Sequence, residues 1–187
     1  MQNDEELIAG CIDGDVRAQK ALYDRYAALL MGVSYRYARN HTDAEDILQE
    51  AFLKIFQSLN RFRFEGSFEG WMRRIVVTTA LNYMNRSKHI RESLAIEAMS
   101  YEVPAQQEEA SIKLNGKDLM ICIQSLPDGF RTVLNLHAIE GYSHKEISSM
   151  LQISESTSRS QYMRAKAMLA MRILERNKIL VPVDKAG

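Results

Sequence analysis

The chain has 187 residues, its 24 Lys and Arg residues balance 24 Asp and Glu, and 46% of its residues are hydrophobic. This composition is typical of a globular protein and excludes a disordered or fibrous chain, while the longest segment without a charged side chain, residues 75–85, is too short and too polar to span a bilayer. The acidic N-terminus is unlike a secretory signal. Cys11 and Cys122 are far apart in the sequence and match neither a disulfide framework nor a zinc site. We therefore expect a cytoplasmic protein with no membrane insertion, no metal and no cofactor.

The charges are arranged in blocks along the chain. Residues 1–60 hold six basic and ten acidic side chains, a balance of −4, and residues 61–91 hold seven and two, a balance of +5. Residues 92–118 hold two and six, a balance of −4, and residues 142–180 hold seven and three, a balance of +4. Solvated helix faces would explain any single block. Two basic blocks that each follow an acidic one favour surfaces with different partners, because local fields persist where the net charge is zero.

The N-terminal half predicts three helices. Apolar side chains recur every three or four residues over 15–39 and again over 43–59, which is the helical period. A third helix is expected from Ser67, a good N-cap, to Arg86. The connection before it, residues 60–66, contains two phenylalanines and two arginines.

The second of these helices carries an acidic patch. Asp46 and Glu50 are one turn apart with Gln49 beside them, and all three face away from the apolar stripe. Such a patch repels DNA phosphate and suits a basic protein partner. The alternative is a face that is merely solvated.

Aromatic and basic side chains alternate in the region that follows. The aromatic residues are Phe62, Phe64 and Trp71, and the arginines are Arg61, Arg63, Arg73 and Arg74. Unpaired nucleic-acid bases need a stacking face beside cationic groups that neutralise the backbone. The alternative is a set of core aromatics with solvated arginines, and we expect this for Trp71 because it has helical spacing to Ile75.

The remaining chain predicts a linker and a second helical domain. Residues 93–112 lose the apolar period and gain Glu, Gln, Ser and Pro, which is typical of a flexible acidic linker. The period resumes at Leu119, and a helix that begins after Pro127 continues through Ile139 and ends at Gly141. We therefore expect an all-α protein with two small helical domains, at residues 1–92 and 113–180, and a tail at 181–187.

A helix-turn-helix is expected within the second domain. Ser143 and Glu146 have capping-box spacing, the chain breaks at residues 152–153, and Ser154 caps a second helix over 155–174. The core-facing line of this helix is Ser158, Tyr162, Ala165 and Leu169, and the opposite face presents Glu155, Ser156, Arg159, Ser160, Met163, Arg164 and Lys166. That face suits a DNA major groove, since arginine can bond guanine through two hydrogen bonds. An ordinary helical hairpin with a basic exposed face is the alternative.

The motifs at residues 43–52, 66–75 and 141–169, in this order, resemble those of the extracytoplasmic-function (ECF) subgroup of bacterial RNA polymerase sigma factors, and the resemblance covers nearly the whole chain. It implies a protein that directs core RNA polymerase to specific promoters and assists DNA melting. Its partners would be core polymerase, the double-stranded −35 element and the melted −10 element of promoter DNA. Free members of the subgroup are often held by an anti-sigma protein, which makes such a partner an expectation here.

The resemblance also implies three sets of site residues. Those expected to bind core polymerase are Asp43, Asp46, Gln49, Glu50 and Phe52. Those expected at the −10 element are Asn60, Arg61, Phe62, Arg63, Arg74, Thr78, Asn82 and Arg86, with the 60–67 loop around a base flipped out of the stack and Phe62 at or near its pocket. Those expected at the −35 element are Ser156, Thr157, Arg159, Ser160, Met163, Arg164 and Lys166.

Two positions depart from the pattern of the subgroup. Thr78 stands where many relatives have Asn, and one hydroxyl replaces the donor and acceptor of an amide, so base preference is expected to change there. Ser158 stands where a buried Val is usual. The lost apolar contact should cost about 1 kcal/mol if the hydroxyl bonds a backbone carbonyl.

Two other classes of function compete with this interpretation. A helix-turn-helix activator or repressor that does not replace the sigma subunit explains residues 113–180 equally well, but it leaves the acidic helix and the aromatic loop unexplained. Only a sigma factor would yield promoter-specific transcripts from core polymerase. An enzyme is disfavoured. His137 and Glu140 have the spacing of a helical metal-binding pair, but the sequence has no second such pair, and it has no phosphate-binding loop or nucleophile motif.

Overall fold

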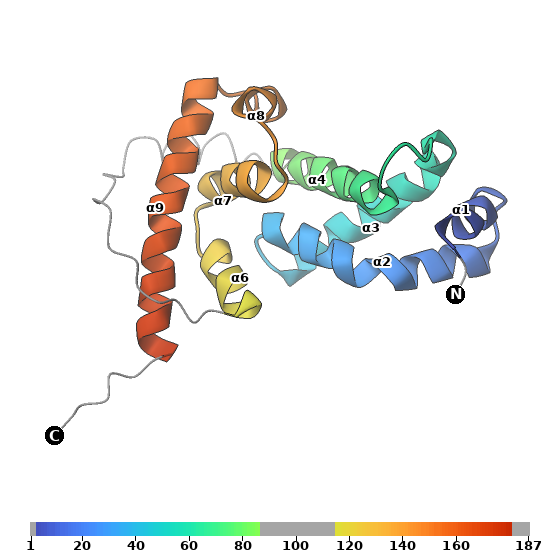
Figure 1. The fold of residues 1–187 in the computed structure, drawn as a ribbon, viewed down its shortest axis with the longest axis horizontal. Coiled ribbons are helices and arrows are strands. Elements are labelled where there is room, and N and C mark those ends of the chain that lie inside the picture. The colour runs from blue at the N-terminus through green and yellow to red at the C-terminus, as the bar shows by residue number, and fades with distance from the viewer. Residues whose placement is uncertain (1–2, 87–114, 181–187) are drawn as a thin grey trace. The chain divides into compact units, whose positions relative to one another are not determined.

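The computed structural model describes residues 3–86 and 115–180, with side chains to residue 177 (Figure 1). Every secondary-structure element in these ranges is a helix, which confirms the predicted all-α class. The chain divides into two compact units, Met1–Ser87 and Lys88–Gly187. The expected linker at 93–112 and the tail at 181–187 lie outside the described residues. No helix in the described ranges is both long and apolar enough to cross a membrane.

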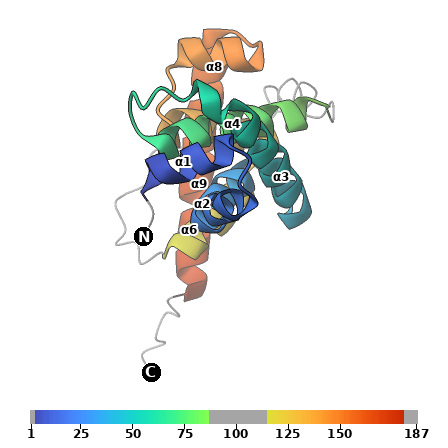
Figure 2. The ribbon, with the colours of Figure 1, turned by 90° about the vertical axis from the view of Figure 1, so that its right-hand side faces the viewer.

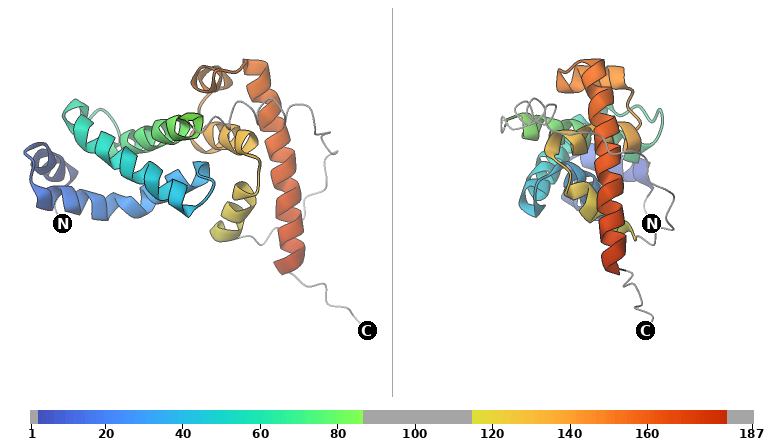
Figure 3. Two further views of the ribbon diagram at one scale, coloured as in Figure 1. Left: turned by 180° about the vertical axis from the view of Figure 1, so that it is seen from behind. Right: turned by 90° about the vertical axis from the view of Figure 1, so that its left-hand side faces the viewer.

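The described residues of unit 1 form four α-helices and one 3-10 turn, and the three long helices lie side by side (Figure 3). Its elements are α1 (Asp4–Ile12), α2 (Val16–Tyr37), α3 (His41–Ser58), η1 (Leu59–Arg61) and α4 (Phe68–Arg86). Helices α2, α3 and α4 pack against one another in all three pairs, while α1 packs on α2 and η1. The three helices predicted from the period are confirmed within a few residues. Helix α1 was not predicted.

Local side chains determine where the helices of unit 1 begin. The Asn3 and Glu6 side chains form a reciprocal capping box at α1, and Asp15 accepts a hydrogen bond from a first-turn amide of α2. Asn40 does the same at α3. The predicted cap Ser67 accepts a hydrogen bond of 3.2 Å from the Gly70 amide. Each cap satisfies a backbone donor that has no partner within the helix.

Apolar stripes from all four helices form the core of unit 1. A β-carbon on Gly10 would lie 2.8 Å from the Ala18 β-carbon, so α1 can approach α2 this closely only because residue 10 has no side chain. The largest fully buried side chains of the unit are Leu7, Ile8, Leu22, Leu30, Tyr37, Ile47, Ile55, Leu59 and Met72. This core holds α3 and α4 in contact, which places the candidate site residues of both helices on one unit.

Unit 2 is built around one long helix. Within residues 115–180 its elements are α6 (Gly116–Gln124), α7 (Asp128–Leu134), the π-helix η2 (Asn135–Ile139), α8 (His144–Leu151) and α9 (Glu155–Leu180). Helix α9 packs against α6, α7 and α8, with α8 beside its N-terminal end (Figures 1 and 2). Asp118 of α6 is buried and accepts hydrogen bonds from the Arg176 guanidinium at 2.8 and 2.9 Å, which ties α6 to the C-terminal part of α9.

The core of unit 2 differs from the predicted core line of its last helix. Ser158 and Ala165 are buried as expected, but Gln161 and Met168 are the other buried positions, whereas Tyr162 and Leu169 are only partly buried. The buried cluster consists of Leu126, Phe130, Leu134, Ala165 and Met168. At two of the four predicted core positions the buried residue is therefore the one before the predicted residue, Gln161 in place of Tyr162 and Met168 in place of Leu169. Helix α7 packs on that side of α9.

The predicted helix from Asp128 through Ile139 changes its type partway. Residues 135–139 are π-helical, and the Glu140 amide donates to the Asn135 carbonyl over 3.0 Å, a span of five residues. Gly141 then adopts a φ of +78° and ends the segment. A π-turn inserts an extra residue and turns later side chains to a new side of the helix. Here it directs His137 toward α8 and α9, as its ring contacts show below.

Candidate functional site

The predicted polymerase-binding side chains lie on α3. Asp46 and Gln49 are exposed, while Asp43 and Glu50 are half-buried. We call these four residues the acidic surface. Phe52 differs from them because it is 3% exposed and its ring packs against Tyr23, with the ring centroids 4.6 Å apart. It lies beneath the surface rather than on it.

The acidic surface contacts the C-terminal part of α4. The Tyr83 hydroxyl lies 3.1 Å from Asp46 Oδ2 and 3.3 Å from Asp43 Oδ1, and it donates its proton to these carboxylates. Burial and the hydrogen bond to Asp46 raise the pKa of Tyr83 to about 12. The phenol therefore remains protonated and a donor at neutral pH, and it holds two acidic side chains of α3 in place.

Glu50 accepts from two basic groups at once. Lys54 Nζ lies 2.8 Å from its Oε1, and the Arg86 guanidinium donates to both carboxylate oxygens over 3.2 Å each. Hydrogen bonding to Lys54, and then the charge of Arg86, hold the pKa of Glu50 below its ordinary value. Lys54 also donates to Thr79 Oγ1 over 3.1 Å, so it links α3 to α4. Sequence reasoning missed Lys54 of α3 and Tyr83 of α4, because each contacts the other helix, at Thr79 and Asp43, across 25 and 40 residues of sequence.

Four residues assigned to the −10 element follow one face of α4. Arg74, Thr78, Asn82 and Arg86 are spaced four residues apart and all are exposed. The Thr78 hydroxyl donates within its own helix, at 2.9 Å from the Arg74 carbonyl and 3.0 Å from the Ile75 carbonyl. Position 78 consequently presents a methyl group and an oxygen acceptor, with its donor already engaged.

An aromatic cluster joins the 60–67 loop to the start of α4. Phe62 is half-buried, and its ring centroid lies 5.0 Å from that of Phe64, 5.1 Å from Phe68 and 5.4 Å from Trp71. Trp71 is half-buried rather than fully in the core as we expected, and it stacks on the buried Phe68. Phe64 is 52% exposed with a positive φ of 56°. Its ring, which the sequence did not single out for the pocket, is the exposed edge of the cluster.

The polar residues of this loop all reach solvent. Asn60, Arg61 and Arg63 are exposed. Together with the exposed Phe64 ring and Arg74 they place cationic and stacking groups on adjoining segments. This is the combination that a single strand with unstacked bases requires.

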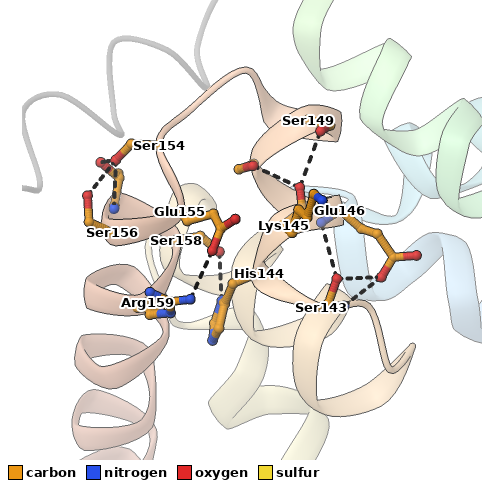
Figure 4. Close-up of polar contacts among 12 residues, drawn as sticks. Ser143, His144, Lys145, Glu146, Ser149, Ser154, Glu155, Ser156, Ser158 and Arg159 are labelled. Carbon is orange, nitrogen blue, oxygen red and sulfur yellow. Dashed lines mark hydrogen bonds and ion pairs between the residues drawn. The ribbon is translucent and has the colours of Figure 1, made fainter.

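The turn of the helix-turn-helix is defined by its caps (Figure 4). Ser143 and Glu146 form the predicted capping box, with 2.8 Å between the Ser143 amide nitrogen and Glu146 Oε2. Helix α8 ends at Gln152, which adopts the left-handed conformation with φ at 55°. The Ser154 hydroxyl then accepts a hydrogen bond of 3.0 Å from the Thr157 amide, which confirms the predicted start of α9.

The outer face of α9 carries the residues predicted for the −35 element. Met163 is 57% exposed, and the Arg159 side chain is 63% exposed and paired with Glu155 at 2.9 Å (Figure 4). Lys166 Nζ lies 5.7 Å from the centre of the Tyr162 ring. The other predicted residues are Ser156 and Ser160, which are exposed, and Thr157 and Arg164, which are half-buried. The seven residues lie in the N-terminal half of one helix, and it is the N-terminal part of this helix that contacts bases in helix-turn-helix proteins.

Ser158 has a side-chain partner in the other helix of the helix-turn-helix. Its hydroxyl and Nδ1 of His144 share a hydrogen bond of 2.9 Å, so a backbone carbonyl, the condition attached to the cost above, is not its partner (Figure 4). His144 stacks on His137 with 4.2 Å between the ring centroids. Among the described residues, no group of three or more His, Cys, Asp or Glu side chains could hold a metal ion.

Comparison with known protein families matches both units. The Sigma-70 region 2 family matches residues 22–90, and the Sigma-70, region 4 family matches residues 117–169. The first range includes the acidic surface and the exposed face of α4. The second includes the helix-turn-helix.

Similar proteins extend over almost the entire chain. It is 31% identical to the ECF RNA polymerase sigma-E factor of Escherichia coli (strain K12) in an alignment of 176 positions, which covers 87% of this chain and 90% of that protein. It is 29% identical to the ECF RNA polymerase sigma-E factor of Haemophilus influenzae, over 91% of this chain and 95% of that protein. Among solved structures it is similar to the sigma factor RpoE of Bartonella quintana, solved in complex with the anti-sigma factor NepR, with a TM-score of 0.47, 19% identity and coverage of 91% of this chain and 100% of that one.

Proposed function

Because this chain belongs to the ECF group of RNA polymerase sigma factors, which direct core polymerase to specific promoters, we propose that its two units divide promoter recognition between them. Residues 1–92 bind core polymerase through the acidic surface and hold the melted −10 strand. Residues 93–112 connect the units. Residues 113–180 bind the double-stranded −35 element through the outer face of α9.

One observation carries this division: the acidic surface of α3 and the basic outer face of α9 belong to different units. Carboxylates repel DNA phosphate and attract a basic protein, while arginines on an exposed recognition helix suit a major groove. Opposite charges on separate units therefore support two different partners. A repressor with the same helix-turn-helix has no use for the first surface.

At the −10 element we propose that the aromatic cluster receives a base that has left the stack. Phe62 forms the floor, held by Phe68 and Trp71, and Phe64 offers an exposed ring on which a base can stack. Stacking of this kind returns about 1–3 kcal/mol per base, enough to offset part of the unstacking energy. Arg74, Asn82 and Arg86 then follow the strand along α4.

The remaining features of the proposal follow from the family. Sigma factors are transcription initiation factors that act with RNA polymerase, and we propose that this chain catalyses no reaction itself, so that RNA synthesis stays with the polymerase. We also propose that it is cytoplasmic and joins the nucleoid when it is bound to polymerase. An anti-sigma protein that covers these surfaces in the free state stays a prediction.

Glu50→Ala is expected to weaken binding to core polymerase by about 2 kcal/mol, the lower end for a hydrogen-bonded charge pair at an interface. Titration of core enzyme with a fluorescently labelled chain measures the affinity. Glu45→Ala is the matched control, because Glu45 is an exposed acidic residue of α3 that lies outside the acidic surface and pairs with His41. Intact core affinity together with lost promoter binding would show that the division of labour is wrong.

Arg159→Ala and Arg164→Ala are each expected to weaken binding of the holoenzyme to a promoter by about 1–3 kcal/mol, the usual cost of losing a base-specific arginine contact. On a promoter with a scrambled −35 element, the variants and the wild type should bind with equal affinity. Arg172→Ala serves as the control, since Arg172 lies on the same helix and is also paired with a glutamate, Glu175. An equal loss on intact and scrambled promoters would contradict base reading by α9.

A further inference from the structure

The hydrogen bond between His144 and Ser158 joins the two helices of the helix-turn-helix side chain to side chain. His144 is the first residue of α8, and Ser158 is the fourth residue of α9. Ser158 is fully buried, and its Oγ lies 2.9 Å from His144 Nδ1 (Figure 4). A buried hydroxyl that lost this partner would have to find another or remain unsatisfied, so the bond favours one arrangement of the two helices.

The His144 ring is itself held from behind. The His137 ring stacks on it with an angle of 22° between the planes, and the Tyr162 ring of α9 meets His137 edge-on at 4.5 Å. His137 Nδ1 donates to the Tyr142 carbonyl over 2.8 Å, which fixes the orientation of its ring. The π-helical turn at 135–139 supplies His137 to this stack. His144 is therefore confined between η2 and α9.

The position of Ser158 couples this bond to the DNA-facing side of α9. Arg159 and Ser160 follow Ser158 directly in the chain and are exposed. A hydrogen bond to a base tolerates a change of only a few tenths of an ångström in the distance between donor and acceptor. An arginine that makes two such bonds to one base also requires the correct angle. A small tilt of the first turns of α9 would therefore weaken base reading without unfolding the unit.

We propose that His144 is a positioning residue for promoter recognition, which through its hydrogen bond to Ser158 sets the angle at which α9 presents Arg159 and its neighbours to the −35 element. The inference rests on the proposed function of α9 and adds a residue that does not touch DNA. It also gives a role to Ser158, a polar residue at a buried position of the recognition helix.

The test compares Ser158→Thr with Ser158→Val in the full-length chain bound to core polymerase. Thr and Val have nearly the same shape, and both add a methyl group at a buried site, so they differ in the hydroxyl alone. The probes are a promoter fragment selected by the wild-type holoenzyme and the same fragment with a scrambled −35 element. Preference for the intact fragment should be retained by Ser158→Thr and should fall by roughly three- to tenfold in Ser158→Val, the usual range for one hydrogen bond.

A second pair of variants tests the other partner. His144→Asn retains a polar group near the position of Nδ1, whereas His144→Ala removes it. His144→Ala should lower the preference for the −35 element in the wild-type background and should have little further effect when Ser158 is already Val, because both changes remove the same bond. Ser149→Ala, which removes an exposed α8 hydroxyl bonded to the Lys145 carbonyl, should change nothing.

The outcomes separate this inference from the function on which it rests. If Ser158→Val and Ser158→Thr show the same preference while Arg159→Ala loses it, the positioning role is wrong and −35 recognition by α9 stands. If Arg159→Ala retains the full preference, the proposed function of α9 itself fails. Additive losses in the His144 and Ser158 pair would also overturn the inference, because two residues that act through one bond cannot add.

Discussion

Replacing Phe130 with alanine is expected to remove about 3–5 kcal/mol from the stability of unit 2, the usual cost of deleting a buried aromatic side chain. Phe130 is fully buried at the centre of a cluster with Leu126, Leu134, Ala165 and Met168. Because this cluster joins α7 to the recognition helix, its loss should abolish −35 binding at temperatures where unit 1 is still folded. Far-UV circular dichroism during thermal unfolding should show a new early transition.

The single tryptophan of the chain provides the control for this experiment. Trp71 lies in unit 1, so its fluorescence reports the unfolding of that unit. In the Phe130→Ala variant the tryptophan fluorescence transition should stay at the wild-type temperature. The circular dichroism curve should show two separate transitions. Phe130→Leu, which retains most of the volume, should cost much less. A tryptophan transition that moves together with the dichroism signal would show that the chain unfolds as one cooperative body.

Phe52→Ala is expected to have the reciprocal effect, a loss of about 3–5 kcal/mol from unit 1. The Phe52 ring is 3% exposed and contacts the rings of Tyr23 and Phe56, with centroids 4.6 and 5.9 Å distant. Its deletion should therefore move the tryptophan transition to lower temperature. The neighbouring Leu53 is 63% exposed, and Leu53→Ala should change stability by less than about 0.5 kcal/mol.

Phe52→Ala also tests the assignment of Phe52 to the polymerase interface. Affinity for core enzyme is measured well below the new transition, where nearly every molecule is folded. An unchanged affinity would show that Phe52 contributes to the stability of unit 1 and not to polymerase binding. A loss that Leu53→Ala does not share would show that Phe52 contributes to binding by supporting the acidic surface from beneath.

The start and end points of the helices were readable from the sequence because they depend on neighbours. Ser67, Ser143 and Ser154 bond backbone amides within three residues, and the structure shows these contacts where the caps were predicted. Helix α1 was missed although Asn3 and Glu6 have the spacing of a capping box, because its short apolar pattern gives little periodic signal.

Contacts between helices could not be read in the same way. The bonds from Tyr83 to Asp46 and from Arg86 to Glu50 join residues 37 and 36 positions apart, and only the packing of α4 on α3 brings them together. The side of α9 that faces the core was equally ambiguous, because positions 161 and 162 both fit a period of 3.6. The hydrophobic pattern favoured Tyr162, and Gln161 is nevertheless the buried residue.

Within the loop, the sequence indicated the aromatic cluster but not its exposed member. Phe62 and Phe64 are both flanked by charged or basic residues, so nothing local distinguishes them. The structure distinguishes them, because Phe64 has a positive φ and a ring that is 52% exposed, while Phe62 packs on Phe68 and Trp71.

The double pairing of Glu50 has a consequence for how the chain behaves before it meets polymerase. DNA binding gains free energy by releasing condensed cations, and each phosphate that a protein neutralises adds about 0.9 to the slope of log affinity against log salt. Glu50 carries one negative charge and pairs it with both Lys54 and Arg86 within the protein, so the positive charge of Arg86 is already partly compensated. In the free chain Arg86 should therefore contribute less to the release of ions from random DNA than a cation without an acidic partner. Engagement of Glu50 by a basic partner would free Arg86 and make DNA binding more sensitive to salt in the complex than in the free protein.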